Sequence, residues 1–378
     1  MKINKLLIIS DTKMIKNKSG NYAFNSVVKE LDIFLDLFET ITWIGFDYSD
    51  EPIDNTILNV NHRKINLILL RRSGGQSFAH KLKVLLRSFE YSVTINREVK
   101  TADVIHSRGP SVPMLLALLI SVFNRKPKWW FKYANNWNDQ NPPISWGFQK
   151  RMMLKFKWVI GTVNGSWDNM PSHIFPFENP CLDNLPKIDF PPKVINTKWS
   201  FLFVGRLEEK KGFRKILEAL KFLNLDQIEN VTFIGTGSEE HIVFDLINNH
   251  PYLSKIKFLG SQSKEEVFEA MKSAHYLLLP STSSEGFPKV IAEAWYNGCV
   301  PIVSDVSCVG QYIKDGVNGF LCSVIEDNNF IETLKRATLV DFDKFRMMQL
   351  EGYKMCSLFT YKFYKERLVK EIIREYNY

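Results

Sequence analysis

The sequence has 378 residues, of which 45% are hydrophobic and 24% are charged, with a formal net charge of +8. This is the composition of a globular protein, so it excludes a disordered or fibrous chain. The length exceeds what one hydrophobic core usually holds, so we expect two domains. No apolar run reaches the roughly 18–20 residues of a membrane-spanning helix.

Short apolar runs alternate with longer amphipathic stretches in the first half of the chain. This pattern is typical of βα repeats. The opening residues 1–11 are interpreted as a first strand and not as a signal peptide. Helices are predicted over 21–38 and 111–123. The predicted strands are 5–10, 40–46, 66–70, 103–106, 128–133 and 158–163.

A proline-rich stretch, 179–199, interrupts the alternation and is interpreted as a linker. After it the alternation resumes, and the tail from about residue 326 is predicted to be helical. The predicted strands of the second half are 201–205, 231–235, 255–260, 275–280 and 300–304. We therefore expect two α/β domains, 1–180 and 181–360, and a C-terminal helix, 361–378, that packs back on the first domain.

Strands joined by helices form parallel sheets, and their ligands bind beyond the carboxyl ends of the strands. The segment FVGRLEEKKGF, residues 203–213, follows such a strand. Gly205 and Gly212 let backbone N–H groups approach an anion at the following helix N-terminus. Arg206 can bind a phosphate with two hydrogen bonds, and Lys211 can act as a point charge. A surface loop without a ligand is the alternative.

A second turn of this kind, VTFIGTGSEE at 231–240, contains Gly235 and Gly237. It lacks the third glycine of the dinucleotide fingerprint, so it is weak evidence for NAD and disfavours a dehydrogenase.

Two glutamates eight positions apart, Glu285 and Glu293, stand on either side of a Gly-Phe-Pro break. Because Pro288 favours the first turn of a helix, we place Glu285 in the preceding loop and Glu293 inside the helix. Glu285 could then accept hydrogen bonds from sugar hydroxyls, and Glu293 could bind a ribose diol with its two oxygens. A cap and a solvated helix residue are the alternatives.

Taken together, residues 200–322 resemble the donor-binding domain of family 4 retaining glycosyltransferases, which have the GT-B fold. The resemblance includes GRLEEKKG, FIGTGSEE, EGFPKVIAEA, NGCVPIVSD and DGVNGFLC in the order and spacing of that family. It implies two facing Rossmann-like doubly wound domains with a cleft between them. In these terms the first half is the acceptor side and the second half binds the nucleotide sugar.

The resemblance also implies roles for single residues. Arg206 and Lys211 match the residues that neutralise the donor diphosphate. Glu285 approaches the hydroxyls of the donor sugar, and Glu293 holds the ribose. Gly205, Gly237, Gly286 and Phe287 complete the donor site, with Phe287 and the amides near Gly286 lining the sugar. The family needs no metal, and the DFD string at 341–343 is rejected as a metal site because it lies in the helical tail.

The first half resembles the family less. Many relatives have an active-site histidine at the end of the strand that here reads WWFKYANNW, and Lys132 falls near that position. We therefore expect Lys132 to contact the sugar or the phosphate. His106 matches a less central position, where a histidine with its hydrogen bonds made at a strand end is the simpler interpretation. Relatives often have paired glycines in the first loop, whereas this chain has Gly20 alone.

The predicted function is a metal-independent, retaining transfer of a hexose-type sugar from a UDP- or GDP-sugar to an acceptor hydroxyl, without a further cofactor. The acceptor is expected to be a glycan or lipid-linked glycan in cell-surface polysaccharide or lipopolysaccharide synthesis. A nucleotide-sugar epimerase of the same fold and a non-catalytic sugar-nucleotide-binding subunit are the alternatives.

The net charge is uneven, because residues 1–180 contain 24 Lys and Arg against 15 Asp and Glu. Two basic segments, 80–100 and 124–132, contribute much of it, the second beside Trp129 and Trp130. Basic residues beside exposed aromatics suit an anionic membrane surface. A solvated basic face with both tryptophans in a core strand is the alternative, and nucleic acid is not expected. The patch proposed from the sequence is Lys81, Lys83, Arg87, Arg125, Lys126 and Lys128.

Five cysteines without a CxxC pair are interpreted as buried thiols of a reducing compartment. The expected location is therefore the cytoplasm, with peripheral attachment to the inner face of the membrane.

Overall fold

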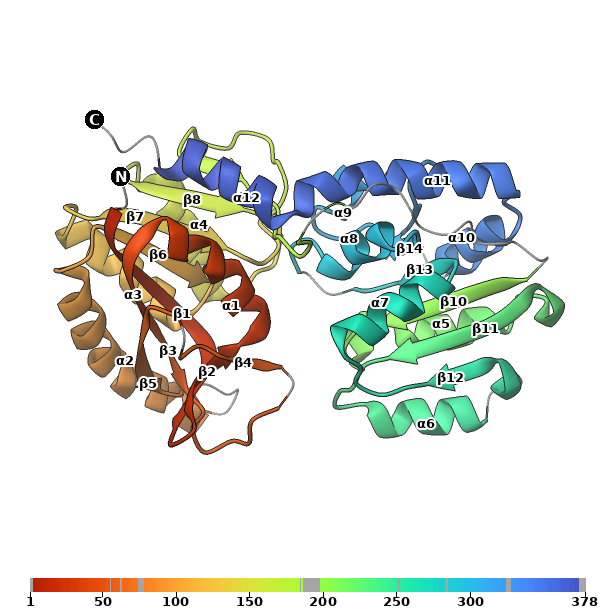
Figure 1. The fold of residues 1–378 in the computed structure, drawn as a ribbon, viewed down its shortest axis with the longest axis horizontal. Coiled ribbons are helices and arrows are strands. Elements are labelled where there is room, and N and C mark those ends of the chain that lie inside the picture. The colour runs from red at the N-terminus through yellow and green to blue at the C-terminus, as the bar shows by residue number, and fades with distance from the viewer. Residues whose placement is uncertain are drawn as a thin grey trace. The chain divides into compact units, whose positions relative to one another are not determined.

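The chain divides into two compact units in the computed structural model (Figure 1). Unit 1 comprises Met1–Phe177 together with Lys365–Tyr378, and unit 2 comprises Glu178–Tyr364. The end of the chain thus belongs to unit 1. The predicted linker lies largely outside the described residues. The structure describes residues 3–54, 56–61, 63–73, 78–183, 185, 198–249, 252–282, 285–323 and 328–373.

Unit 1 is built on a mostly parallel sheet in the order β5-β3-β1-β6-β7-β8-β9, with β2 and β4 added antiparallel at the end of β1. The chain runs from β1 outward to β3 and β5, then returns to β6 on the other side of β1. The strand order therefore reverses between β1 and β6, where open α/β sheets bind ligands. The strands are β1 (Ile3–Asn17), β2 (Gly20–Phe24), β3 (Phe38–Asp47), β4 (Ile57–Asn59), β5 (Ile65–Arg71), β6 (Val104–Gly109), β7 (Lys128–Tyr133), β8 (Val159–Val163) and β9 (Ile174–Pro176).

Three helices cover one face of this sheet, because each belongs to a right-handed crossover in the same direction. Along that face α2 packs on α3 and α3 packs on α4. The C-terminal helix α12 crosses from unit 2 to unit 1 after Tyr364, and in unit 1 Lys365 pairs with Asp36, the last residue of the short helical turn after α1. The helices are α1 (Asn25–Leu31), α2 (Phe78–Val99), α3 (Val112–Phe123), α4 (Ile144–Lys155) and α12 (Tyr361–Arg367).

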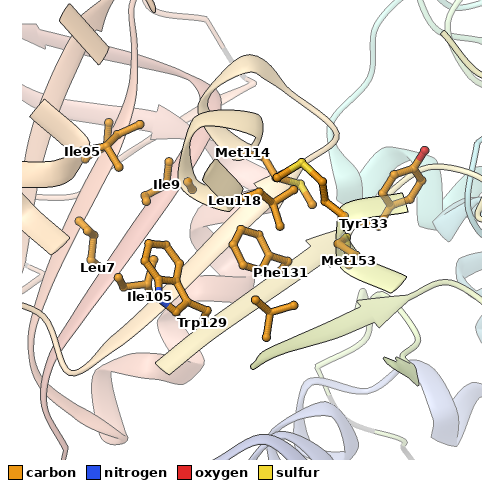
Figure 2. Close-up of a cluster of buried hydrophobic side chains, with 14 of the residues drawn as sticks. Leu7, Ile9, Ile95, Ile105, Met114, Leu118, Trp129, Phe131, Tyr133 and Met153 are labelled. Atoms are coloured by element: carbon orange, nitrogen blue, oxygen red, sulfur yellow. The ribbon is translucent and has the colours of Figure 1, made fainter. Parts of the chain in front are cut away.

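The core of unit 1 lies between the sheet and these three helices. Trp129 and Phe131 of β7 pack with Ile105 of β6 and with Leu118 of α3 (Figure 2). On the other face of the sheet, Trp130 is equally buried. Of the two interpretations of Trp129 and Trp130, the core strand is confirmed and exposure at a membrane is wrong, because both side chains belong to a strand that is covered on its two faces.

The helix predicted over 21–38 begins only at Asn25. Residues 20–24 pair instead with the end of β1. The turn between the strands is set by Asn17, whose Oδ1 accepts hydrogen bonds from the backbone N–H of Ser19 and of Gly20. Gly20 has φ of 141°, a conformation that favours glycine. The hairpin thus takes the first residues of the predicted helix.

Unit 2 contains a six-stranded, fully parallel sheet in the order β12-β11-β10-β13-β14-β15. Its strand order reverses between β10 and β13. The strands are β10 (Trp199–Val204), β11 (Ile228–Ile234), β12 (Ile256–Phe258), β13 (Tyr276–Leu279), β14 (Val300–Ser304) and β15 (Phe320–Cys322). The helices are α5 (Phe213–Leu220), α6 (Glu240–Asn248), α7 (Lys264–Ser273), α8 (Lys289–Tyr296), α9 (Val309–Tyr312), α10 (Asn329–Thr338) and α11 (Phe342–Met355).

All five cysteines are buried and none forms a disulfide. Burial raises the pKa of the Cys181 and Cys308 thiols to about 12, so both stay protonated at neutral pH. They act as small apolar side chains of unit 2.

Candidate functional site

The loop after β10 is held against the loop after β13 by backbone contacts. The carbonyl oxygen of Lys210 accepts hydrogen bonds from the N–H of Thr282 at 2.8 Å and from Oγ of Ser281 at 2.9 Å. Gly212, with φ of 81°, stands just before α5. A Cβ there would lie 2.2 Å from the carbonyl oxygen of Pro280. The two loops can approach so closely only because residue 212 is glycine.

The loop after β11 packs against the β10 loop in the same way. A Cβ on Gly235 would lie 1.9 Å from the carbonyl oxygen of Gly205, and one on Gly237 would lie 2.4 Å from that of Leu207. The N–H of Leu207 donates to the carbonyl of Thr236 at 3.0 Å. The close packing of the two loops therefore explains these glycines without a ligand. The donor contacts predicted for Gly205 and Gly237 stay predictions.

Three predicted site residues meet at the carboxyl ends of β10 and β13. Lys211 Nζ lies 2.5 Å from Oε1 of Glu285, and Arg206 Nη2 lies 3.7 Å from the same oxygen. Arg206 also pairs with Glu208 at 2.9 Å. Lys211 and Glu285 are 74 positions apart, so only the fold brings them together.

Exposure differs within this cluster of Arg206, Lys211 and Glu285. The Arg206 side chain is 65% exposed and that of Glu285 39% exposed, whereas Lys211 is only 11% exposed. Arg206 and Glu285 are therefore accessible to a ligand, whereas most of the Lys211 side chain is covered. Arg206 and Lys211 supply two cations at the point where the strand order of unit 2 reverses, each paired with a carboxylate, Glu208 or Glu285.

Glu285 precedes α8 and Glu293 lies inside it, as the sequence predicts. Pro288 stands at the N-cap of α8. Proline has no backbone N–H, and the helix needs no N–H donor at this position. The Glu293 side chain is partly buried near Cys181, where its negative charge adds to burial in raising the pKa of the thiol. Its predicted hold on a ribose stays a prediction.

The ring of Phe287 is buried under this loop. It stacks on Phe359 with 4.6 Å between ring centroids and meets Tyr312 edge-on at 4.9 Å. Gly286 beside it is buried as well. The ring therefore supports the loop from the core and does not face solvent. A sugar contact of Phe287 would have to come from its backbone.

Lys132 lies in unit 1 and is buried in an ion pair that the sequence did not indicate. Its Nζ is 2.6 Å from Oε1 of Glu30, and Arg108 holds the same carboxylate with both terminal nitrogens at 2.8 and 3.1 Å. Lys132 and Arg108 are opposite each other on β7 and β6. Lys132 and Arg108 thus share the carboxylate of Glu30. The predicted contact of Lys132 with the donor stays a prediction.

His106 lies next to this ion cluster and is fully buried. Its ring stacks on Trp130 with 3.6 Å between centroids and meets Phe34 edge-on. Neither ring nitrogen has a hydrogen-bond partner in the part of the chain that the structure describes. Burial, followed by the positive charge of Arg108, holds the pKa of His106 well below its usual range. His106 is thus a neutral, stacked side chain, and not one with its hydrogen bonds made.

The DFD string has a structural role at the start of α11. Oδ1 of Asp341 accepts a hydrogen bond from the backbone N–H of Lys344 at 2.8 Å, the contact of an N-cap. Within the described ranges, no three His, Cys, Asp or Glu side chains gather in a way that could hold a metal ion.

Residues 186–349 match the family described as "Glycosyl transferases group 1". These residues form a glycosyltransferase group 1 domain. The domain contains Arg206, Lys211, Glu285 and Glu293, and it covers the sheet of unit 2.

Two curated proteins are similar to this part of the chain. An uncharacterized glycosyltransferase of Methanocaldococcus jannaschii is 30% identical over 176 residues, which are 46% of this chain and 47% of that protein. The amylovoran biosynthesis glycosyltransferase AmsK of Erwinia amylovora is 30% identical over 126 residues, 32% of this chain and 31% of AmsK. The aligned segments span less than half the length of these relatives.

The whole chain is similar in fold to HepE of Anabaena, solved in complex with UDP. The match has a TM-score of 0.70 at 14% identity and covers 99% of this chain and all of that one. With two parallel-sheet α/β units and a group 1 domain, the protein has the GT-B fold.

Proposed function

We propose that the protein is a glycosyltransferase that moves a hexose-type sugar from a nucleoside diphosphate sugar to an acceptor hydroxyl. The observation that carries the proposal is the cluster of Arg206, Lys211 and Glu285 at the reversal of strand order in the group 1 domain. Two cations and a carboxylate there match the two parts of such a donor, its anionic diphosphate and its sugar hydroxyls.

In this proposal the chain stabilises the leaving group. The bond between C1 of the sugar and the phosphate oxygen breaks, and negative charge grows on the diphosphate. Arg206 and Lys211 offset that charge without a metal ion, since both are fixed before the reaction. Glu285 orients the sugar, and Glu293, eight residues further on and inside α8, binds the ribose. UDP is the nucleotide favoured first, because the HepE structure of the same fold contains it.

We further propose that the anomeric configuration is retained, as the family resemblance implies. On a same-face route the acceptor oxygen bonds to C1 while its proton passes to the departing phosphate oxygen. This route needs no nucleophile from the chain. A double-displacement route would need a carboxylate on the far face of C1. Determining the anomer of the first product by NMR tests retention directly.

The acceptor class is proposed from the relatives and from charge. AmsK takes part in the biosynthesis of amylovoran. A lipid-linked glycan in cell-surface polysaccharide synthesis would place anionic head groups opposite the basic unit 1, and each Lys or Arg near such a surface contributes about 1 kcal/mol. No helix in the described part of the chain has the length and apolarity to cross a bilayer. Attachment would therefore be peripheral.

Incubation with a panel of UDP-, GDP- and ADP-sugars tests the proposal. A transferase releases free nucleotide slowly by hydrolysis and faster with an acceptor. A nucleotide-sugar epimerase would form a new sugar nucleotide, and a non-catalytic binding subunit would change neither donor nor nucleotide. The proposal is supported if the wild type releases nucleotide and Arg206→Ala does not. Unchanged release in that variant contradicts it.

Metal independence is tested separately. We expect full activity in EDTA, because the diphosphate charge is offset by Arg206 and Lys211. Loss of activity in EDTA with recovery on adding Mn²⁺ or Mg²⁺ would contradict this part of the proposal and leave the transferase assignment in place.

A further inference from the structure

Helix α2 of unit 1 carries large apolar side chains on its outer surface. Leu85 and Leu86 are each 69% exposed, Phe89 is 77% exposed and Val93 is 53% exposed. We call these four residues the α2 stripe. A single exposed leucine needs no explanation, but several at neighbouring positions form a patch that water disfavours.

The spacing of the α2 stripe makes it one continuous surface. Positions 85, 89 and 93 follow each other at i, i+4, and 86 precedes 89 by three residues, so all four lie on one side of the helix. The side of α2 that faces the sheet is formed by other residues. Tyr91, Ile95 and Val99 fill the core of unit 1. The α2 stripe is therefore not needed to hold the helix on the sheet.

Cationic side chains border the α2 stripe. Lys83 and Lys100 are exposed, and Arg97 is 67% exposed although it also pairs with Glu98 at 3.1 Å. Glu90 is the exposed acidic residue on the same side. Apolar side chains flanked by Lys and Arg are the pattern of a helix that lies in the interface of an anionic bilayer.

We propose that α2 docks unit 1 on an anionic membrane by inserting the α2 stripe below the lipid head groups. The proposal rests on the lipid-linked acceptor proposed above and names the surface that meets the bilayer. With 22 residues α2 is about 33 Å long, and apolar faces of such helices enter by about 5–10 Å. Lys83, Arg97 and Lys100 would then lie at the level of the lipid phosphates.

The structure also revises the patch proposed from sequence. Lys128 belongs to strand β7, and Arg87 donates a hydrogen bond to the backbone carbonyl of Arg72. Arg125 lies over the ring of Trp158. The Lys81 side chain lies outside the described residues. Lys83, Arg125 and Lys126 remain exposed cations of that patch, and the apolar stripe is the part that the sequence did not indicate.

A bilayer fits this surface better than a second copy of the chain. In a twofold contact through the α2 stripe the bordering cations would face their own copies, and like charges at close range oppose association. Anionic lipid instead offsets them. The cations that border the α2 stripe therefore favour an anionic lipid surface over a second copy of the chain.

Vesicle co-sedimentation of the full chain tests the proposal. Leu86→Ser with Phe89→Ser removes half of the stripe without changing charge. We expect its partition onto vesicles with about 30% phosphatidylglycerol to fall at least about tenfold. The matched control is Phe222→Ser in unit 2, another largely exposed phenylalanine, which should bind like the wild type. An unchanged melting temperature verifies that the variants are folded, since the side chains are exposed.

Salt separates the apolar from the electrostatic contribution. High salt screens exposed charges, so it should weaken wild-type binding but leave a residual that the double variant lacks. Unchanged partition of the double variant, or no wild-type binding to anionic vesicles at low salt, would overturn the proposal. So would a wild-type dimer without lipid that the double variant converts to a monomer, because the stripe would then be a contact between copies. Hydrolysis of nucleotide sugars without vesicles is measured on the same proteins, so a failed transferase assignment is seen independently.

Discussion

The Glu285 carboxylate lies where a diphosphate is proposed to bind. It accepts from Lys211 at 2.5 Å and faces Arg206 at 3.7 Å. An incoming diphosphate must share these cations with Glu285 or displace it, and in either case two anions approach each other. Glu285 therefore opposes binding of the free nucleotide, even though it is proposed to help position the sugar.

Replacing Glu285 with Gln should tighten UDP binding and lower turnover. The amide keeps the shape of the side chain but removes the competing charge. Because the pair is partly exposed, we expect a gain of about two- to fivefold in UDP affinity. Isothermal titration calorimetry with UDP gives the affinity, and release of nucleotide from the donor sugar gives the turnover.

Two further variants are measured beside Glu285→Gln. Arg206→Ala should weaken UDP binding by about 1.5–3 kcal/mol, the worth of a hydrogen bond to a charged group. Glu208→Gln removes the other carboxylate partner of Arg206 and serves as the matched control. Weaker UDP binding in Glu285→Gln would show that the carboxylate holds Lys211 in place for the ligand, contrary to the expectation.

At the level of residues, the sequence predicted the position of a site residue where a local motif contains that residue. Arg206 and Lys211 share one strand-to-helix loop, and the Gly-Phe-Pro break before a helix located Glu285. The sequence was not sufficient for Phe287, whose ring is covered by Phe359, 72 positions away on the printed sequence. The same holds for Lys132, whose partner Glu30 is 102 positions away. A local sequence pattern does not indicate which distant residues pack against a side chain.

At the level of elements, three glycines in two loops, Gly212, Gly235 and Gly237, let the β10, β11 and β13 loops pack on each other. Gly212 combines a positive φ with a Cβ position 2.2 Å from Pro280. Gly260, with φ of 66°, has the same kind of backbone but open space around it. The two positions therefore separate the cost of backbone strain from the cost of a collision.

Gly260→Ala should lower the free energy of unfolding by about 1–2 kcal/mol, the cost of a left-handed conformation for alanine. Gly212→Ala should cost more and should also weaken UDP binding, because the β10 loop must move away from Pro280. Urea unfolding and UDP titration measure both effects. Equal losses of stability with unchanged UDP affinity would mean that the loop contact does not shape the site.

Strands β6 and β7 bury His106, and this predicts a pH dependence of stability. Its folded-state pKa is held below the unfolded value of about 6.5, chiefly by burial. The unfolded chain then takes up a proton that the folded chain does not, so the contribution of His106 is complete above about pH 6.5 and declines as the pH falls. Arg108 and Lys132 oppose protonation, and Glu30 favours it.

His106→Phe should therefore reduce the loss of stability between about pH 7.5 and about pH 5.5. The limiting slope for one proton is about 1.4 kcal/mol per pH unit. Urea unfolding at the two pH values, followed by tryptophan fluorescence, measures the difference. His241→Gln, at an exposed position on α6, is the control. An identical pH dependence in wild type and His106→Phe would exclude His106 as its source.

Strand and helix prediction succeeded where the hydrophobic period was undisturbed. Both β7 and β14 were predicted with their observed bounds, since each is a short, mostly apolar segment. It failed at residues 20–24, where the turn chemistry of Asn17 and Gly20 outweighs the helical pattern that follows. It also missed β4, β9 and β15, strands of three residues each, which are too short to show a period by themselves, whereas β12, of the same length, was predicted within the longer segment 255–260.

At the level of the whole molecule, the chain passes between the two units twice, at 177/178 and at 364/365. The returning segment is tied to unit 1 by several contacts. Arg367 donates to the carbonyl oxygen of Pro176 at 2.7 Å and lies over the ring of Phe177, while Leu368 and Ile372 are buried. The two ends of unit 1 that flank unit 2 are thus close together, and the last residues complete its fold.

Residues 1–177 alone should consequently be much less stable than the same segment joined to 365–378. Because Arg367 touches Pro176, a flexible linker of about four to six residues spans the gap. Burying Leu368 and Ile372 should contribute about 3–6 kcal/mol, from about 1.5–3 kcal/mol for each side chain. The urea midpoints of the two proteins measure the gain, and the fused protein with Leu368→Ser should lose much of it. Equal midpoints for 1–177 with and without the fused segment would mean that unit 1 folds without the end of the chain.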